Sequence, residues 1–168
     1  GENLYPFTKT GKKWNLELPF STPVNYVQIC GAGQEVLSPD LPIAHGYGRP
    51  YNYIELPDED GLFELRDVPH GTLTQEFYKS KISDNWEKLI LYLPPCVPSA
   101  GLPVLYLQHG FGESEISWST TGKVNILMDN LIAAGKIKPF AIVMGNGMVK
   151  QRIDGELKLN RALFGQML

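Results

Sequence analysis

The second half of this sequence predicts an α/β fold, and roughly the first 65 residues predict a smaller all-β segment. Two short apolar runs, 104–108 and 140–144, are bounded by proline or glycine, which is typical of strands covered on both faces. An apolar stripe at helical spacing lies between them and predicts a helix that ends at Gly135. The order strand, helix, strand predicts a right-handed parallel unit, which defines the α/β class.

The all-β segment is predicted from alternation and from turn residues. Residues 14–20 alternate apolar and other side chains, which indicates a half-buried strand. Residues 25–30 and 34–37 predict a hairpin through the turn at 31–33. The density of proline and glycine over 38–50 indicates an irregular loop, and 51–56 return to a strand. These strands are few for a complete sandwich, so we expect strands to be missing in front.

Beyond residue 71 the pattern changes to longer strands. Residues 74–80 and 86–93 predict two strands joined by a polar turn at 83–85, followed by a proline-rich loop over 94–103. After the strand at 140–144 comes a loop, and Leu157–Leu168 predict the start of a second helix. We expect that helix to continue past the last residue.

Composition excludes several classes of protein. The net charge of -3 comes from scattered acids and bases, so no basic stripe predicts a nucleic-acid partner. No apolar stretch is long enough to cross a membrane, and the start shows no signal-peptide pattern, which predicts a soluble chain. Cys30 and Cys96 lie far apart without metal-ligand spacing, and we expect two buried free thiols.

The most informative motif is Gln108-His109-Gly110-Phe111-Gly112, directly after a predicted buried strand. Ligands of α/β sheets bind at the carboxyl ends of the strands, so the loops at 109–118 and 145–149 are the candidate site. Glycines let a backbone N–H approach a developing oxyanion without obstruction by a side chain. The alternative is a glycine-rich turn that only leads the chain out of the strand.

Several further motifs occur in a fixed order around this loop. Together they resemble the esterase family that includes feruloyl and acetyl-xylan esterases, carbohydrate esterase family one, over about residues 60–168. Residues 14–56 resemble, more weakly, the later strands of an immunoglobulin-like carbohydrate-binding module, with Ser38-Pro39-Asp40 at the end of its hairpin. The motifs of the esterase resemblance are 67–71 (DVPHG), 92–95 (YLPP), 103–110 (PVLYLQHG), Trp118, 129–133 (DNLIA) and 143–147 (VMGNG).

The resemblance implies a partial α/β-hydrolase sheet with flanking helices over 67–168, preceded over 1–66 by a partial β-sandwich module. It implies that the backbone N–H of Phe111 is an oxyanion-hole donor and that its side chain borders the acyl pocket. It also implies that His109 shapes the loop and is not the catalytic base. The substrate-binding residues it implies are Gly110, Gly112, Trp118 and Asn146, although a core-packed tryptophan and a turn-forming asparagine remain alternatives for the last two.

An esterase of this fold needs a serine, an acid and a histidine in that order, and none can be assigned here. No Gly-x-Ser-x-Gly is present, and Ser114 is interpreted as part of a solvent-exposed loop. We therefore expect both modules to be truncated and this chain to be inactive alone. The implied parent cleaves feruloyl or acetyl esters on plant cell-wall xylan through an acyl-enzyme, and is secreted or at the cell surface.

No cofactor or metal site is predicted. The acidic run 58–61 lacks the alternating ligands of a calcium loop and indicates a solvated turn. Structural hydrogen bonds are the favoured role for His45 and His70. Two alternatives stay open, an esterase of siderophores or small thioesters and a noncatalytic carbohydrate-binding fragment that uses Tyr47, Tyr51 and Tyr53. The sequence leaves the oligomeric state undecided.

Overall fold

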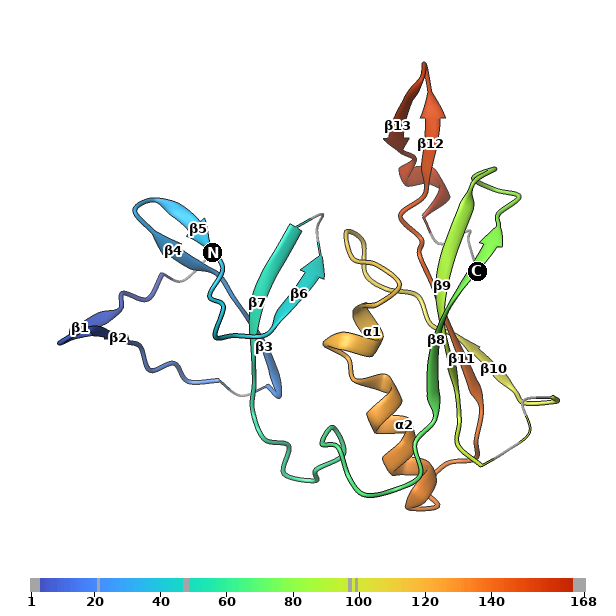
Figure 1. Cartoon of the computed structure of the whole chain (residues 1–168), viewed down its shortest axis with the longest axis horizontal. Helices are drawn as coiled ribbons and strands as arrows, with labels where there is room; N and C mark the ends of the chain where they lie inside the picture. Colours follow the sequence, from blue (N-terminus) through green and yellow to red (C-terminus); the bar gives the residue numbers. More distant parts are fainter. Residues whose placement is uncertain (1–3, 21, 47–48, 97, 99, 165–168) are drawn as a thin grey trace.

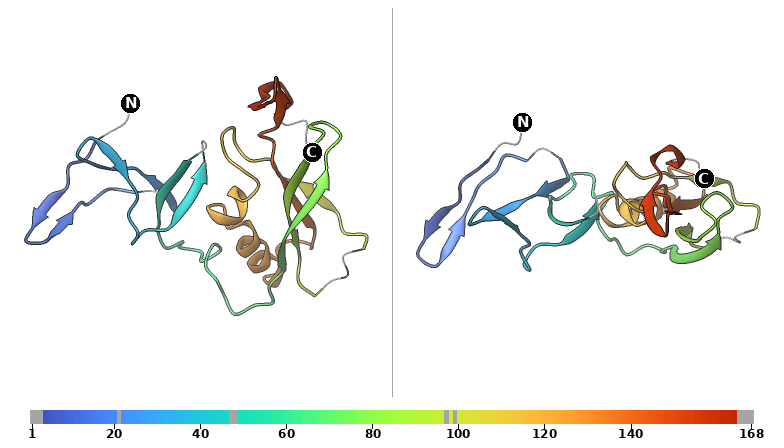
Figure 2. Two further views of the ribbon diagram at one scale, coloured as in Figure 1. Left: turned by 45° about the horizontal axis from the view of Figure 1, so that its top comes forward. Right: turned by 90° about the horizontal axis from the view of Figure 1, so that it is seen from above.

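The structure is a computed structural model that describes residues 4–20, 22–46, 49–96, 98 and 100–164. An all-β front part extends away from a second part, in which helices pack on a mixed sheet (Figures 1 and 2). This order of an all-β part followed by a part with strands and helices agrees with the prediction. No helix within the described ranges has the length and apolar character that a membrane-spanning helix needs.

The front part consists of one small sheet and two separate hairpins. Strands β3, β7 and β6 form an antiparallel sheet in the order β3-β7-β6, while β1 pairs with β2 and β4 with β5. The predicted hairpin is confirmed as β4–β5, and its turn residues Ala32 and Gly33 have φ of 51° and 77°, as a type I′ turn requires. The strands of this part are β1 (Thr8–Thr10), β2 (Lys13–Asn15), β3 (Val24–Val27), β4 (Ile29–Gly31), β5 (Gln34–Val36), β6 (Ile43–Gly46) and β7 (Arg49–Glu55).

Two predictions for the front part are wrong. Residues 16–20 form no strand, although Leu16, Leu18 and Phe20 are half-buried in alternation as predicted. Trp14 lies in β2 but is 62% exposed, because no described element covers that hairpin. The predicted loop 38–50 contains β6, which forms because β7, itself starting at Arg49, offers a partner for it. Strand formation depends on such distant partners, which local composition does not report.

The second part is built on a four-stranded sheet in the order β10-β11-β9-β8. Its strands are β8 (Thr72–Lys79), β9 (Trp86–Leu93), β10 (Val104–Tyr106) and β11 (Ala141–Gly145), which confirms the four predicted strands. β10 and β11 are parallel and the other two pairs are antiparallel. The residues of β10 are 41–58% exposed, so the prediction that it is covered on both faces is wrong. No described element packs on these side chains, and β10 forms an edge of the described sheet.

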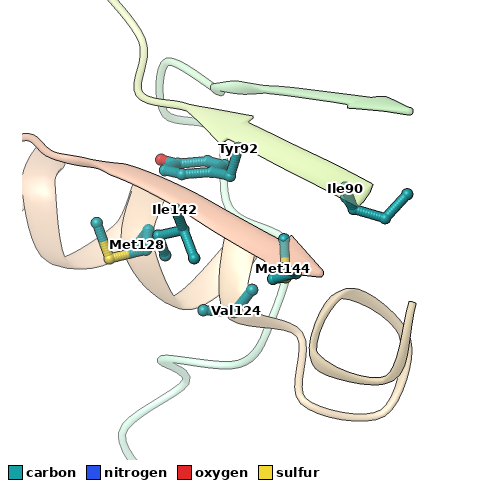
Figure 3. Close-up of a cluster of buried hydrophobic side chains, with 6 residues drawn as sticks. All are labelled: Ile90, Tyr92, Val124, Met128, Ile142 and Met144. Atoms are coloured by element: carbon teal, nitrogen blue, oxygen red, sulfur yellow. The ribbon is translucent and has the colours of Figure 1, made fainter. Parts of the chain in front are cut away.

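Helix α2 (Val124–Ala133) covers one face of this sheet (Figure 1). It ends as predicted, since Gly135 has φ of 66° and its N–H donates to the Ile132 carbonyl at 2.9 Å. The short helix α1 (Ser117–Thr120) precedes it. Side chains of β9, β11 and α2 interdigitate to form the core (Figure 3), which consists of Ile90, Tyr92, Val124, Met128, Ile142 and Met144.

The helix predicted for Leu157–Leu168 is wrong over the described residues. Strands β12 (Lys150–Ile153) and β13 (Glu156–Leu159) form a hairpin that projects from the body, followed by a 3₁₀ turn, η1 (Arg161–Leu163) (Figure 1). Asp154 and Gly155 have φ of 53° and 83°, so Asp-Gly forms the hairpin turn for which it is suited. Residues 165–168 lie outside the described ranges.

Burial differs from expectation in two respects. Cys30 and Cys96 are free but exposed, so the prediction that they are buried is wrong. Cys30 lies in the small hairpin β4–β5, which has no covering layer, and Cys96 lies in the turn after β9. Within the described front part, Ala44 is the one buried hydrophobic residue. Two packed layers are therefore not formed there, and a β-sandwich module is not confirmed.

Candidate active-site loops

The loops that follow the parallel strands β10 and β11 lie side by side and contact each other at three points. The N–H of Gly147 donates to His109 Nε2 at 3.0 Å. The N–H of Gly112 lies 3.3 Å from the sulfur of Met148. The side-chain amide of Asn146 donates to Glu115 Oε2 at 2.8 Å. The structure thus brings together the two loops predicted from the sequence, 109–118 and 145–149. We call the segments 107–116 and 145–149 the crevice loops.

His109 is a linking residue between these loops. Its side chain is buried, with 3% exposed. Because Nε2 accepts a hydrogen bond from Gly147, the ring proton lies on Nδ1, which donates to the Gly110 carbonyl at 2.7 Å. Both nitrogen atoms are occupied within the protein. This arrangement fits a histidine that shapes the loop rather than one that accepts a proton from a nucleophile.

Phe111 lies in the first crevice loop and is 43% exposed. Its ring packs edge-on against Phe164 at 5.4 Å, and the Arg161 guanidinium lies 5.3 Å from its centroid. Within the described residues the Phe111 N–H donates no hydrogen bond. The N–H groups on either side of it are engaged, which fixes the peptide units around the Phe111 donor.

The two flanking glycines have different structural roles. Gly110 donates its N–H to Glu113 Oε2 at 3.0 Å, and its carbonyl accepts the Glu113 N–H at 3.1 Å, which forms a tight turn. Gly112 has φ of 91°, a conformation that side chains other than glycine rarely adopt. The glycine of position 112 is therefore required by the backbone of the loop, independently of any ligand.

Trp118 and Asn146 both support the crevice loops through hydrogen bonds. The indole Nε1–H of Trp118 donates to the Gln108 carbonyl at 3.0 Å, at the start of the first loop. The Trp118 ring is 38% exposed and lines a cavity of about 370 Å³ shared with residues of the front part such as Glu55. Asn146 accepts the Met148 N–H at 2.9 Å, so it forms a turn as well as contacting Glu115.

The sequence did not identify an ion pair behind the crevice loops, in which the Glu115 carboxylate is buried and the Lys88 side chain is 47% exposed. Glu115 is 2% exposed, and its Oε1 lies 2.7 Å from the Nζ of Lys88 in β9. The sequence could have indicated Lys88, because alternation along β9 places this charged residue on the same face as the buried Ile90 and Tyr92. No local signal marks Glu115. Ser114 beside it is half-buried, so its interpretation as solvent-exposed is wrong.

A second polar cluster lies away from the crevice loops and centres on the buried Asp129 of α2. Its carboxylate accepts hydrogen bonds from the Tyr92 hydroxyl at 2.6 Å and the Gly71 N–H at 3.0 Å, and it lies 3.0 Å from His70 Nδ1. The predicted structural role of His70 is thus confirmed. Burial, the hydrogen bond to Asp129 and the negative charge of Asp129 raise the pKa of Tyr92 well above its ordinary value of 10.0.

The remaining candidates form no site in the described part of the chain. His45 is exposed on β6, and its side chain makes no hydrogen bond to the other described residues, so the role predicted for it is not confirmed. Asp58 accepts the N–H groups of Leu62 and Phe63 at 2.6 and 3.2 Å, as a turn residue does. No group of three or more His, Cys, Asp or Glu side chains among the described residues is arranged to hold a metal ion.

Comparison with known proteins identifies the segment that carries these loops. Residues 80–160 match the family described as "Putative esterase". The resemblance to this esterase family is confirmed. A curated relative, the endo-1,4-beta-xylanase/feruloyl esterase of Xylanibacter ruminicola, is 42% identical over 103 residues, which are 56% of this chain and 14% of the relative. The chain therefore matches about one seventh of that relative's length.

Solved structures share the fold of this esterase segment. A CE1 ferulic acid esterase from Anaeromyces mucronatus, in complex with ferulic acid, has a TM-score of 0.52 at 20% identity, over 62% of this chain and 38% of that one. An enterobactin esterase from Shigella flexneri has a TM-score of 0.50 at 17% identity, over 68% and 30%. At these identities the likeness shows the fold alone, an α/β sheet of the esterase type that is present here in part.

Proposed function

We propose that this chain is part of a serine carboxylic ester hydrolase that acts on plant cell-wall polysaccharide esters, as a feruloyl or acetyl xylan esterase. The observation that carries the proposal is the crevice-loop geometry, in which the Phe111 N–H donates no hydrogen bond within the described residues and the N–H groups of Gly110 and Gly112 on either side are engaged, at the carboxyl end of β10. The 42% identical xylanase/feruloyl esterase supports the substrate class.

The proposed mechanism assigns a role to each residue of the crevice loops. The Phe111 N–H stabilises the oxyanion of the tetrahedral intermediate, and removal of one such donor typically costs about 10²–10³ in kcat. Gly110 and Gly112 leave the approach to it open, and Trp118 and Asn146 border and support the cleft. The serine, acid and histidine belong to the rest of the parent protein, so an acyl-enzyme forms only there.

The proposal includes the organisation of the parent. Residues 1–66 form a separate module related to carbohydrate-binding modules, and 67–168 form the first half of the esterase domain. All six residues of the buried core, from Ile90 to Met144 in the sequence, lie after this boundary. This supports a boundary between two separately folded modules. The parent binds feruloylated or acetylated xylan and is secreted or displayed at the cell surface.

Hydrolysis assays on two proteins test this proposal. The full-length parent is expected to hydrolyse methyl ferulate or p-nitrophenyl acetate with a burst of acyl-enzyme, and the 168-residue chain is expected to show neither. A burst from the purified 168-residue chain, or no hydrolysis of either ester by the parent, would contradict the proposal. A catalytically inactive esterase of known sequence, handled in the same way, controls for contaminating activity.

Two alternatives make different predictions. The enterobactin esterase with the same fold supports a siderophore or small thioester as substrate, and parent rates on those esters would then exceed the rates on methyl ferulate. A noncatalytic carbohydrate-binding role would use Tyr51 and Tyr53, which share one face of β7, whereas Tyr47 lies outside the described residues. Titration with xylo-oligosaccharides would then change the tyrosine fluorescence of this chain.

A further inference from the structure

Glu115 is the most deeply buried carboxylate near the crevice loops, and its position has a structural cost. A buried charge is unfavourable unless it is paired and hydrogen-bonded. Both carboxylate oxygens of Glu115 are engaged, Oε1 by the Lys88 ammonium at 2.7 Å and Oε2 by the Asn146 amide at 2.8 Å. The two partners come from β9 and from the second crevice loop, so Glu115 links three segments of the chain.

A series of hydrogen bonds leads from Glu115 to the peptide units beside Phe111. Glu115 orients the side chain of Asn146, whose oxygen accepts the Met148 N–H at 2.9 Å. The sulfur of Met148 in turn lies 3.3 Å from the N–H of Gly112, the residue that follows Phe111. Glu115 itself follows Gly112 by three residues on the same loop. The series therefore closes a ring between the two crevice loops.

We propose that Glu115 is a positioning residue, which holds the Phe111 N–H where the oxyanion develops by fixing Asn146 and Met148. Lys88 neutralises the Glu115 carboxylate, so the negative charge does not oppose the oxyanion that Phe111 is proposed to stabilise. This inference rests on the proposed function of Phe111 and deepens it. A shift of the donor by about 1 Å can cost on the order of 100-fold in rate, which gives such positioning a measurable effect.

Two substitutions separate the contacts of Glu115. In Glu115→Gln the side chain keeps its shape but has one oxygen and one NH₂, so it can accept from Lys88 or from Asn146 but not from both. In Glu115→Leu both contacts are lost. Glu156→Gln is the matched control, because Glu156 is 77% exposed and its Lys158 partner lies at 3.6 Å, away from the crevice loops.

The first readout is steady-state hydrolysis of methyl ferulate by the full-length parent, measured well below the melting temperature. We expect kcat to fall about tenfold in Glu115→Gln and about 100-fold in Glu115→Leu, with KM changed less than about twofold. The control should keep the parental kcat. If both Glu115 variants lose thermal stability but keep the parental kcat, Glu115 is only structural and the inference is overturned.

The second readout does not need catalysis and uses the 168-residue chain. In Glu115→Leu we expect the backbone amide resonances of Phe111, Gly112 and Met148 to shift. The hydrogen exchange of the Gly112 and Met148 amides, which donate hydrogen bonds, should accelerate, while amides of α2 stay unchanged. Unchanged Phe111 and Gly112 amides would overturn the inference even if the parent is an esterase. If these amides respond but the unsubstituted parent hydrolyses no ester, the proposed function fails and the positioning role of Glu115 stands.

Discussion

The front part and the second part of the chain pair their strands with similar regularity but bury different side chains. In the second part, β9, β11 and α2 enclose an apolar core whose Tyr92, Ile142 and Met144 are fully buried. In the described front part, the buried side chains are those of the polar Asn52 and the small Ala44, and an open apolar hollow of about 920 Å³ lies in the same part.

This difference shows that strand pairing and core formation are separate requirements. Backbone hydrogen bonds suffice to define β3, β6 and β7, but a sheet buries its apolar face only when a second layer packs on it. Helix α2 supplies that layer in the second part. The short helix α1 contacts β6 of the front sheet, but this contact encloses no apolar core among the described residues. The two parts are therefore expected to respond differently to equivalent substitutions.

The largest expected difference is between two isoleucines. Ile142→Ala removes a fully buried side chain from the core and should lower the free energy of unfolding of the second part by about 2–5 kcal/mol. Ile43→Ala removes a residue of the front part that is 47% exposed. It should change the free energy of unfolding of the front part by less than about 1 kcal/mol. Hydrogen exchange measured by mass spectrometry, peptide by peptide, checks both. Equal effects would mean that the parts share one core.

Asn52 provides the converse test in the front part. Its side chain accepts the Ser38 N–H at 2.7 Å and donates to the carbonyls of Ser38 and Leu41 at 3.1 and 3.3 Å. Asn52→Ala leaves buried backbone groups without partners and should cost about 1–3 kcal/mol. Urea unfolding, followed by the hydrogen exchange of the backbone amides of β6 and β7, measures this cost. Unaltered protection of these strands would show that the polar side chain is not what holds them.

Tyr92 gives a pH-dependent test of the second part. Its pKa is raised in the folded state, so above about pH 10 the unfolded chain releases a proton that the folded chain retains. The stability that Tyr92 contributes is therefore complete below pH 10 and is lost as the pH rises, by at most about 1.4 kcal/mol per pH unit. Tyr92→Phe should cost about 1–2 kcal/mol at neutral pH through the lost hydrogen bond to Asp129.

The pH dependence of stability is compared between Tyr92→Phe and the unsubstituted 168-residue chain. Chemical unfolding at several pH values from 7 to 11 should show the two stabilities converging above pH 10. Tyr106→Phe is the control, because Tyr106 is 58% exposed at the edge of the sheet and should leave the profile unchanged. If stability depends on pH in the same way in Tyr92→Phe and in the unsubstituted chain, the raised pKa of Tyr92 is contradicted.

The smallest expected effect concerns the contact between the two parts. Lys123, before α2, pairs with Glu55 of β7 at 2.6 Å, and both side chains are partly exposed. Lys123→Met should therefore change stability by about 1 kcal/mol or less. Limited proteolysis of the connecting segment 56–66, compared with Lys158→Met, measures whether the contact restrains it. Faster cleavage in Lys123→Met alone is expected; a large loss of global stability would mean that this pair is essential to the interface.

Much of the fold could be predicted because its signals are local. The spacing of apolar residues over 124–132 and the glycine at 135 predict α2. Runs of residues that favour strands predict β8, β9 and β11. The C-terminal prediction failed for a local reason as well. Residues 157–168 predict the start of a helix, whereas the Asp154-Gly155 turn pairs 156–159 with β12 as an exposed hairpin.

The sequence by itself determined the position of the candidate site, since a glycine-rich loop after a strand is a local pattern and the ordered motifs around it indicated the esterase family. Only the tertiary structure decided which side chains fix that loop. Glu115 and Met148 have no distinctive neighbours in the sequence. They come together with Lys88 because the start of β9 and the two loops that follow β10 and β11 lie side by side. Burial likewise depends on which layers are present. Cys30 and Tyr106 are exposed because no described element packs on them, a property that no local pattern encodes.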